Sequence, residues 1–184
     1  MKRRRLVAML LTLGILGCVP ALHAQPQTTE EKIKSAMSAG PPAIAKDATI
    51  LDDVDVAKAK VLKPGTNGWT CPPDDPGTLG NDPQCLDKNG LAWWTALMAH
   101  TAPQLTAPGI DYMLQGGSDA SNTDPFASQP PAGQQWVNSP AHVMFIPGPG
   151  QILDPTNFST DPTSGGPWIM FPGTPYAHLM VPMK

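Results

Sequence analysis

Proline and glycine interrupt this chain at short intervals, and this limits the fold more than any other feature of the sequence. The 184 residues include 23 prolines and 17 glycines. Proline removes a backbone donor that helices and central strands need, and glycine weakens the interior of either element. Five Asp-Pro pairs add turn signals; they begin at Asp75, Asp82, Asp124, Asp154 and Asp161. Five tryptophans and scattered aliphatic runs still favour folding, so we expect a loop-rich domain.

Two uninterrupted segments predict helices. Thr28 and Glu31 have the spacing of a capping box, and the apolar residues that follow predict a helix that ends before Gly40. A second helix is predicted over 91–100, where one helical face carries four residues that are apolar or aromatic: Trp93, Ala96, Leu97 and His100.

Short apolar segments bounded by turn residues predict strands over 48–51, 60–62, 110–114, 142–146, 168–171 and 178–181. The turn at 63–69 predicts a hairpin between 60–62 and 69–71, and 168–181 predicts a second hairpin. Together these elements predict an α+β fold: a small, loop-rich single domain with an antiparallel sheet and one or two helices.

The N-terminus has the parts of a bacterial secretory signal. A basic segment from Lys2 to Arg5 precedes an apolar stretch from Leu6 to Val19, and Ala24 offers a small residue for cleavage. The apolar stretch is shorter than the roughly 20 residues of a membrane-spanning helix, so we expect no transmembrane span. Residues 1–24 are therefore predicted to be a signal peptide, and 25–184 a single exported domain in the periplasm or outside the cell.

A second processing route stays open, because residues 15–18 also read as a lipobox. In that route Cys18 would carry a lipid anchor and become the new N-terminus. Leu16 is bulky for its position in such a motif, and this favours cleavage after Ala24.

Removal of the signal would leave an acidic chain without arginine. The basic residues at 2–5 include every arginine, and what remains is eight lysines against fifteen acidic residues, a net charge of −7. Arginine is the usual residue for bidentate contacts to phosphate, and nucleic acids need a basic surface. Composition therefore excludes nucleic acid as a partner and favours a neutral or cationic ligand.

Cys71 and Cys85 remain in the exported domain whichever processing route applies. In an oxidising compartment such a pair predicts a disulfide, here at the end of the first predicted hairpin, which would stabilise the fold by about 3 kcal/mol through loop closure. A metal site at these cysteines would need further ligands nearby, and the sequence offers none.

A short internal repeat supports a metal-binding hypothesis. Ala-His-Val-Met at 141–144 returns as Ala-His-Leu-Met at 177–180. Residues at i and i+2 share one face of a strand, so pairing these strands would gather two imidazoles and several thioethers: His142, Met144, His178, Met180 and, close by, Met183. Such ligands suit copper, above all Cu(I). The alternative is that the methionines fill the core and the histidines form hydrogen bonds at strand ends.

The polar loop at 115–125 supports two weaker hypotheses. Residues 116–120 loosely resemble the nucleophile elbow of serine hydrolases, with Ser118 as the nucleophile, although the chain is short for an α/β-hydrolase sheet. Asp119, Asn122 and Asp124 could bind Ca²⁺, but their spacing does not match an EF-hand, and an Asx-rich turn is the simpler interpretation.

Three blocks resemble a family of bacterial exported proteins described only as hypothetical. They are 65–71 (Gly-Thr-Asn-Gly-Trp-Thr-Cys), 114–125, and Ser-Gly-Gly-Pro-Trp at 164–168 continued to His-Leu-Met at 178–180. The resemblance covers most of the chain after the signal. It implies export and a shared fold, and it carries no activity, substrate or catalytic residue.

The functional expectation is a small exported protein that binds a ligand rather than transforming it, because the usual sets of acid, base and nucleophile are not found. No cofactor is expected, and copper is the favoured candidate among metals. A copper-binding protein using the repeated His-x-Met strands and a small serine hydrolase using Ser118 are the two alternatives.

Overall fold

A computed structural model of the chain describes residues 27–183, and the predicted signal peptide and Cys18 lie outside the described residues. Three helices are present in this range: α1 (Thr29–Ser38), α2 (Pro42–Ala45) and α3 (Lys88–Met98). The strands are β1 (Thr49–Leu51), β2 (Val61–Lys63), β3 (Thr70–Cys71), β4 (Cys85–Leu86), β5 (Gly109–Met113), β6 (Gly117–Asp119), β7 (Val137–Ser139), β8 (His142–Ile146), β9 (Trp168–Met170) and β10 (His178–Pro182). No helix within 27–183 has the length and apolar character needed to cross a bilayer.

Eight of the strands form one mixed sheet in the order β2-β1-β3-β4-β5-β8-β10-β9, and β6 and β7 pair separately. The sequence predicted a combination of helices and a sheet, which the structure contains. The predicted size and type of the sheet, small and antiparallel, were wrong. The sheet is large, the chain is mostly β, and β1 runs parallel to β3. Frequent prolines and glycines keep the strands at two to five residues, so the chain builds its sheet from many short strands.

The predicted hairpin between 60–62 and 69–71 is wrong, because β1 lies between these two segments. Ile50 pairs with Lys63 of β2 on one side and with Cys71 of β3 on the other. The turn at 63–69, which was expected to close that hairpin, instead crosses the end of β1. There Gly65 packs so closely that a Cβ atom would lie 2.2 Å from the backbone nitrogen of Thr49. The second predicted hairpin, β9 with β10, is confirmed.

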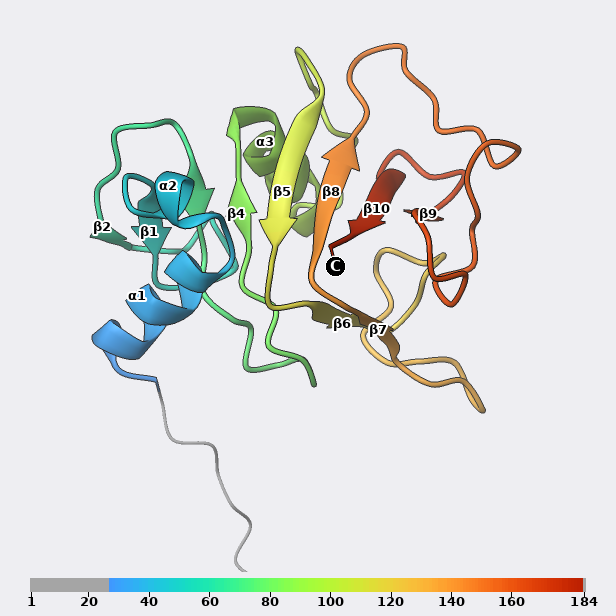
Figure 1. The fold of residues 1–184 in the computed structure, drawn as a ribbon. Helices are drawn as coiled ribbons and strands as arrows, with labels where there is room; N and C mark the ends of the chain where they lie inside the picture. Colours follow the sequence, from blue (N-terminus) through green and yellow to red (C-terminus); the bar gives the residue numbers. More distant parts are fainter. Residues whose placement is uncertain (1–26, 184) are drawn as a thin grey trace, which may run out of the picture.

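The sheet has a core on each face. Helices α1 and α2 lie in front of the β1 end of the sheet in Figure 1, whereas α3 lies behind β4 and β5. The front core contains Ile50 and the two cysteines, with Tyr112 packed against it. The rear core contains Trp93 and Leu97 of α3 with several sheet residues: Met113, Met144, Ile146, Trp168, Met170 and Met180. Alternation along β5 explains the division, since Tyr112 faces one core and Met113 the other.

Both predicted helices are confirmed. The Thr28 side chain caps the N-terminus of α1, and Glu31 returns a bond to the Thr28 backbone, as the capping-box pattern predicts. Helix α3 begins at Lys88, three residues earlier than expected, because Asp87 caps it by accepting a bond from the Gly90 N–H.

Helix α3 approaches the sheet closely at two glycines. A Cβ atom on Gly90 would lie 2.7 Å from the Ile110 carbonyl oxygen, and one on Gly109 would lie 2.6 Å from the Gly90 nitrogen. This contact fixes the distance between the helix and the rear face of the sheet.

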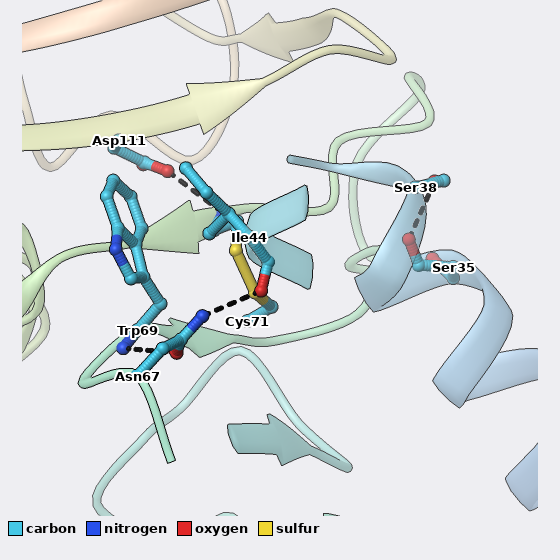
Figure 2. The surroundings of a disulfide bond; sticks show 8 residues. Ser35, Ser38, Ile44, Asn67, Trp69, Cys71 and Asp111 are labelled. Carbon is cyan, nitrogen blue, oxygen red and sulfur yellow. Dashed lines mark hydrogen bonds between the residues drawn. A yellow bond between two sulfur atoms is a disulfide. The ribbon is translucent and has the colours of Figure 1, made fainter. Parts of the chain in front are cut away.

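Cys71 and Cys85 form the predicted disulfide, with an S–S distance of 1.99 Å. It joins β3 to β4 across the antiparallel pair rather than closing the hairpin that was expected. Figure 2 shows Asp111 aimed at this bridge, where its carboxylate accepts a bond of 3.0 Å from the Cys85 N–H. The residues between the cysteines, 72–84, form the disulfide loop, and part of this loop lines a cavity together with residues of the rear core.

Candidate functional site

A cavity of about 130 Å³ lies on the rear side of the molecule, between the sheet, α3 and the disulfide loop. Its lining divides by element into three walls. The sheet wall is Met113, Met144, Met170, His178 and Met180. The α3 wall is Trp93, Trp94 and Leu97. The loop wall is Asp75, Thr78, Asp82, Gln84, Ser118 and Asp119, and Val54, Pro125 and Phe171 complete the lining.

A larger and more open groove, about 650 Å³, runs along the prolines and glycines near Pro103, Pro147 and Pro175. No ionisable side chain lines it. The smaller cavity is the better candidate for a functional site, because of these two hollows only the smaller one is lined by ionisable side chains.

Strand register determines which residues of the sheet wall are neighbours. Met180 of β10 lies opposite Met144 of β8, and His178 lies opposite Met170 of β9. His178 and Met180 are two residues apart on one strand, so their side chains leave the same face. The four residues therefore form a compact group on the rear face of the sheet, named here the His-Met group: Met144, Met170, His178 and Met180.

His178 is held in one tautomer with one nitrogen left unused. Its side chain is 1% exposed, and Nδ1 lies 3.0 Å from the Tyr176 carbonyl oxygen. A carbonyl only accepts, so Nδ1 carries the proton and Nε2 keeps its lone pair. Nε2 has no hydrogen-bond partner among the described residues. Burial lowers the pKa of His178 to about 4, so the ring stays neutral near pH 7.

Two aromatic rings fix the orientation of the His178 imidazole. Trp93 of α3 meets it edge to face at a centroid distance of 4.9 Å, and Phe171 does so at 5.5 Å. These contacts restrict rotation of the ring, so Nε2 is held in one position within the lining of the cavity.

His142 and Met183 are placed differently from the expectation for a metal site. His142 shares the rear face, but it lies opposite Met113 and Pro182 and does not line the cavity. Its Nδ1 donates to the Pro140 carbonyl at 2.7 Å, and Nε2 is buried without a partner. Met183 is 48% exposed and follows Pro182 by one residue, so it does not join the His-Met group.

Sequence reasoning missed Met113 and Met170 as lining residues. Both lie in segments that were predicted to be strands, at positions that alternate with their neighbours. Which methionine would meet His178 depends on the register between β9 and β10, and a single sequence does not fix that register.

The loop wall is built by hydrogen bonds within the disulfide loop. The Asp82 carboxylate accepts from the Thr78 hydroxyl and from the Asp75 N–H at 3.1 Å. Ser118 of β6 accepts from the Gly80 N–H at 2.9 Å, and this bond ties the loop to β6. These contacts hold the loop residues in place beside the cavity.

Two of the carboxylates in this wall, those of Asp82 and Asp119, hold protons more tightly than exposed carboxylates do. Burial raises the pKa of Asp82 to about 6, against the bonds from Thr78 and Asp75 that lower it. Burial, with the nearby negative charge of Asp82 adding to it, raises the pKa of Asp119 to about 7. A positive charge in the cavity would offset both effects.

Three buried polar atoms in the lining have no hydrogen-bond partner among the described residues: Gln84 Oε1, Trp93 Nε1 and His178 Nε2. Buried polar groups in folded proteins are nearly always paired with protein, water or ligand. These three atoms, from residues around one cavity, are available to bond to a ligand or to water.

The structure also locates the residues of the two loop hypotheses. Ser118 Oγ accepts from Gly80, and His178 Nε2 is unbonded, so the two do not form a nucleophile and base pair. Asn122 uses its side-chain oxygen to accept from Trp168 Nε1 at 3.1 Å. Asp124 caps its own turn by accepting from the Phe126 N–H. Within 27–183, no cluster of three or more His, Cys, Asp or Glu side chains is arranged to hold a metal.

Fold and site together define a mixed-sheet protein with a small cavity lined by methionine, aromatic and carboxylate side chains. Comparison with protein-family models, with curated proteins and with solved structures finds no match to this chain.

Proposed function

We propose that this protein is an exported, non-catalytic binding protein that takes a small cation into the cavity between the sheet, α3 and the disulfide loop. The observation that carries this proposal is the polarity of the lining. Its unpaired polar atoms and its carboxylates are mostly acceptors, and no lysine or arginine lines the cavity. A cation is the ligand that such a lining stabilises.

The raised pKa values of Asp82 and Asp119 also support a positively charged ligand. Both carboxylates release their protons more readily when a positive charge lies beside them. Cation binding and proton release are therefore linked, and affinity should increase as pH rises through about 6 and 7, the pKa values of the two groups without ligand.

The size of the cavity supports a small ligand. About 130 Å³ is well below the roughly 300–1,000 Å³ of sites for drug-sized molecules. A metal ion or an organic cation of a few heavy atoms fits this space, and Trp93 and Trp94 offer aromatic faces to its charge.

The hydrogen bonding of Ser118 and His178 supports a binding function rather than hydrolysis. A serine hydrolase needs a base that accepts the proton of the nucleophile, and His178 Nε2 makes no bond to Ser118. Export is supported by the predicted signal peptide and by the disulfide, since such bonds persist in oxidising compartments.

The test is a thermal-shift and calorimetry screen of small organic and metal cations at pH 8 and pH 5. We expect saturable binding at pH 8 that weakens at pH 5. Asp119→Asn should lower the affinity about tenfold, because one charged contact contributes about 1.5–3 kcal/mol. Asp47→Asn is the matched control, since Asp47 is exposed and lies outside the cavity. Equal binding by both variants, or binding of anions alone, would refute the proposal.

A further inference from the structure

The His-Met group has the features of a preformed soft-metal site. It presents one imidazole nitrogen and three thioethers from three neighbouring strands, on the face that lines the cavity. Directly opposed residues in a sheet have Cβ atoms about 4.5–5.5 Å apart. Met144 is opposed to Met180, and Met170 is opposed to His178, so each long methionine side chain can approach its partner above the sheet. His178 and Met180 leave the same face of β10, which brings the two pairs side by side.

The hydrogen bonding of His178 matches that of a metal ligand. A histidine that binds a metal through one ring nitrogen usually donates the other N–H to a carbonyl or carboxylate, which fixes the tautomer and the ring plane. His178 donates Nδ1–H to Tyr176 in this way, and its Nε2 has no partner among the described residues. Packing alone explains the methionines, but it does not explain a buried acceptor without a partner.

We propose that His178 Nε2 and the thioether sulfurs of Met144, Met170 and Met180 bind one Cu(I) ion. The inference rests on the proposed function, because it names the cation that the cavity takes. Thioether and neutral imidazole are soft ligands that select Cu(I), whereas Zn²⁺, Ca²⁺ and Mg²⁺ prefer thiolates, further imidazoles or oxygen. Both described cysteines are joined in the disulfide, so thioethers supply the sulfur.

The loop wall complements a monovalent ion. The His-Met group is neutral, so a bound Cu(I) would bring one buried positive charge. Asp82 and Asp119 line the same cavity and supply negative charge that offsets it. Met113 also lines the cavity, but it lies one strand further away, opposite His142, and is not part of the proposed site.

The test is a titration of the purified protein with Cu(I), kept reduced by ascorbate without air and buffered by a chromogenic Cu(I) chelator. We expect one Cu(I) per chain, sulfur and nitrogen scattering in the X-ray absorption spectrum, and quenching of tryptophan fluorescence from Trp93 and Trp94. The double variant Met144→Leu/Met180→Leu should bind at least about 100-fold more weakly, since even indirect disturbance of a metal site costs 10–100-fold.

Leucine conserves the volume and apolar character of methionine, so the variant should keep its fold, which circular dichroism checks. Met98→Leu/Met183→Leu is the matched control, because these methionines are 41% and 48% exposed and lie outside the cavity. If the double variant does not fold, Met170→Leu alone tests the same group.

The outcomes separate the two proposals. Absence of Cu(I) binding, or equal binding by the cavity variant and the control, overturns the copper site. If organic cations still bind and depend on Asp119 in that case, the proposed function stands without copper. If neither copper nor any other cation binds, both proposals fail.

Discussion

Met144 and Met180 occupy directly opposed positions in the neighbouring strands β8 and β10. Their pairing brings the two copies of the repeated His-x-Met sequence onto one buried face. Because the strands are antiparallel, the two histidines lie on opposite sides of the methionine pair, and only His178 lines the cavity. The repeat therefore yields one candidate ligand group that contains a single histidine.

The Asp119 carboxylate should make the stability of the protein without ligand depend on pH. Its pKa is about 7 in the folded protein and near 3.8 in the unfolded chain. Its stabilising effect is complete below about 3.8 and is lost as pH rises through about 7. Asp119→Asn should therefore gain stability relative to the wild type between pH 5 and pH 8, on the order of 2 kcal/mol given its partial exposure.

Denaturant unfolding of both proteins at the two pH values measures this difference. The comparison is needed because His178 has the opposite effect on stability. Its pKa is lowered by burial, so its protonation destabilises the fold as pH falls from about 6.5 to 4. This effect is the same in both proteins, so the difference between them reports Asp119. A difference between the two proteins that stays constant with pH would contradict the prediction.

Gly90→Ala should destabilise the protein by about 1–3 kcal/mol, although alanine favours helices. The added Cβ would lie 2.7 Å from the Ile110 carbonyl oxygen and force α3 away from the sheet. Gly166→Ala is the control, since no atom lies within 4 Å of its added Cβ. Thermal denaturation of the two variants checks this, and similar melting temperatures would show that the helix does not depend on the close contact.

Loss of the disulfide should lower the free energy of unfolding by about 3 kcal/mol, as expected for a closed loop of about 15 residues. Cys71→Ser/Cys85→Ser should also weaken ligand binding, because the loop between the cysteines forms one wall of the cavity. Urea unfolding with and without reductant measures the effect. Reductant should destabilise the wild type and leave the double variant unchanged; an equal response would assign the effect to something other than this bridge.

Asn122→Ala should lower the free energy of unfolding by about 2 kcal/mol, because Asn122 connects the 120–136 segment to β9. Its oxygen accepts from the buried Trp168 Nε1, and its amide donates to the Thr160 carbonyl at 2.9 Å. Removing it leaves an unpaired indole N–H. Asn138→Ala, at an exposed position, is the control. Equilibrium unfolding of the two variants decides, and equal stabilities would show that Asn122 is a turn residue only.

The sequence by itself determined the local structure. The capping box at Thr28, the helical pattern around Trp93 and the alternating segments around His142 and His178 each identified an element that the structure contains. Those signals are local, since they depend on residues within one or two turns of each other. The cysteine pair was also sufficient to predict the bridge between Cys71 and Cys85.

Only the tertiary structure decided which strands are neighbours and in which register. The turn before Trp69 favoured a hairpin, but in the structure β1 lies between the two strands and its Ile50 is buried in the front core. The same long-range pairing placed Met170 opposite His178 and left His142 outside the cavity. Strand pairing is set by contacts between segments far apart in the chain, and shifting the register by one residue reverses the face of every side chain. The His-x-Met repeat could therefore be recognised in the sequence, while the group that it forms could not.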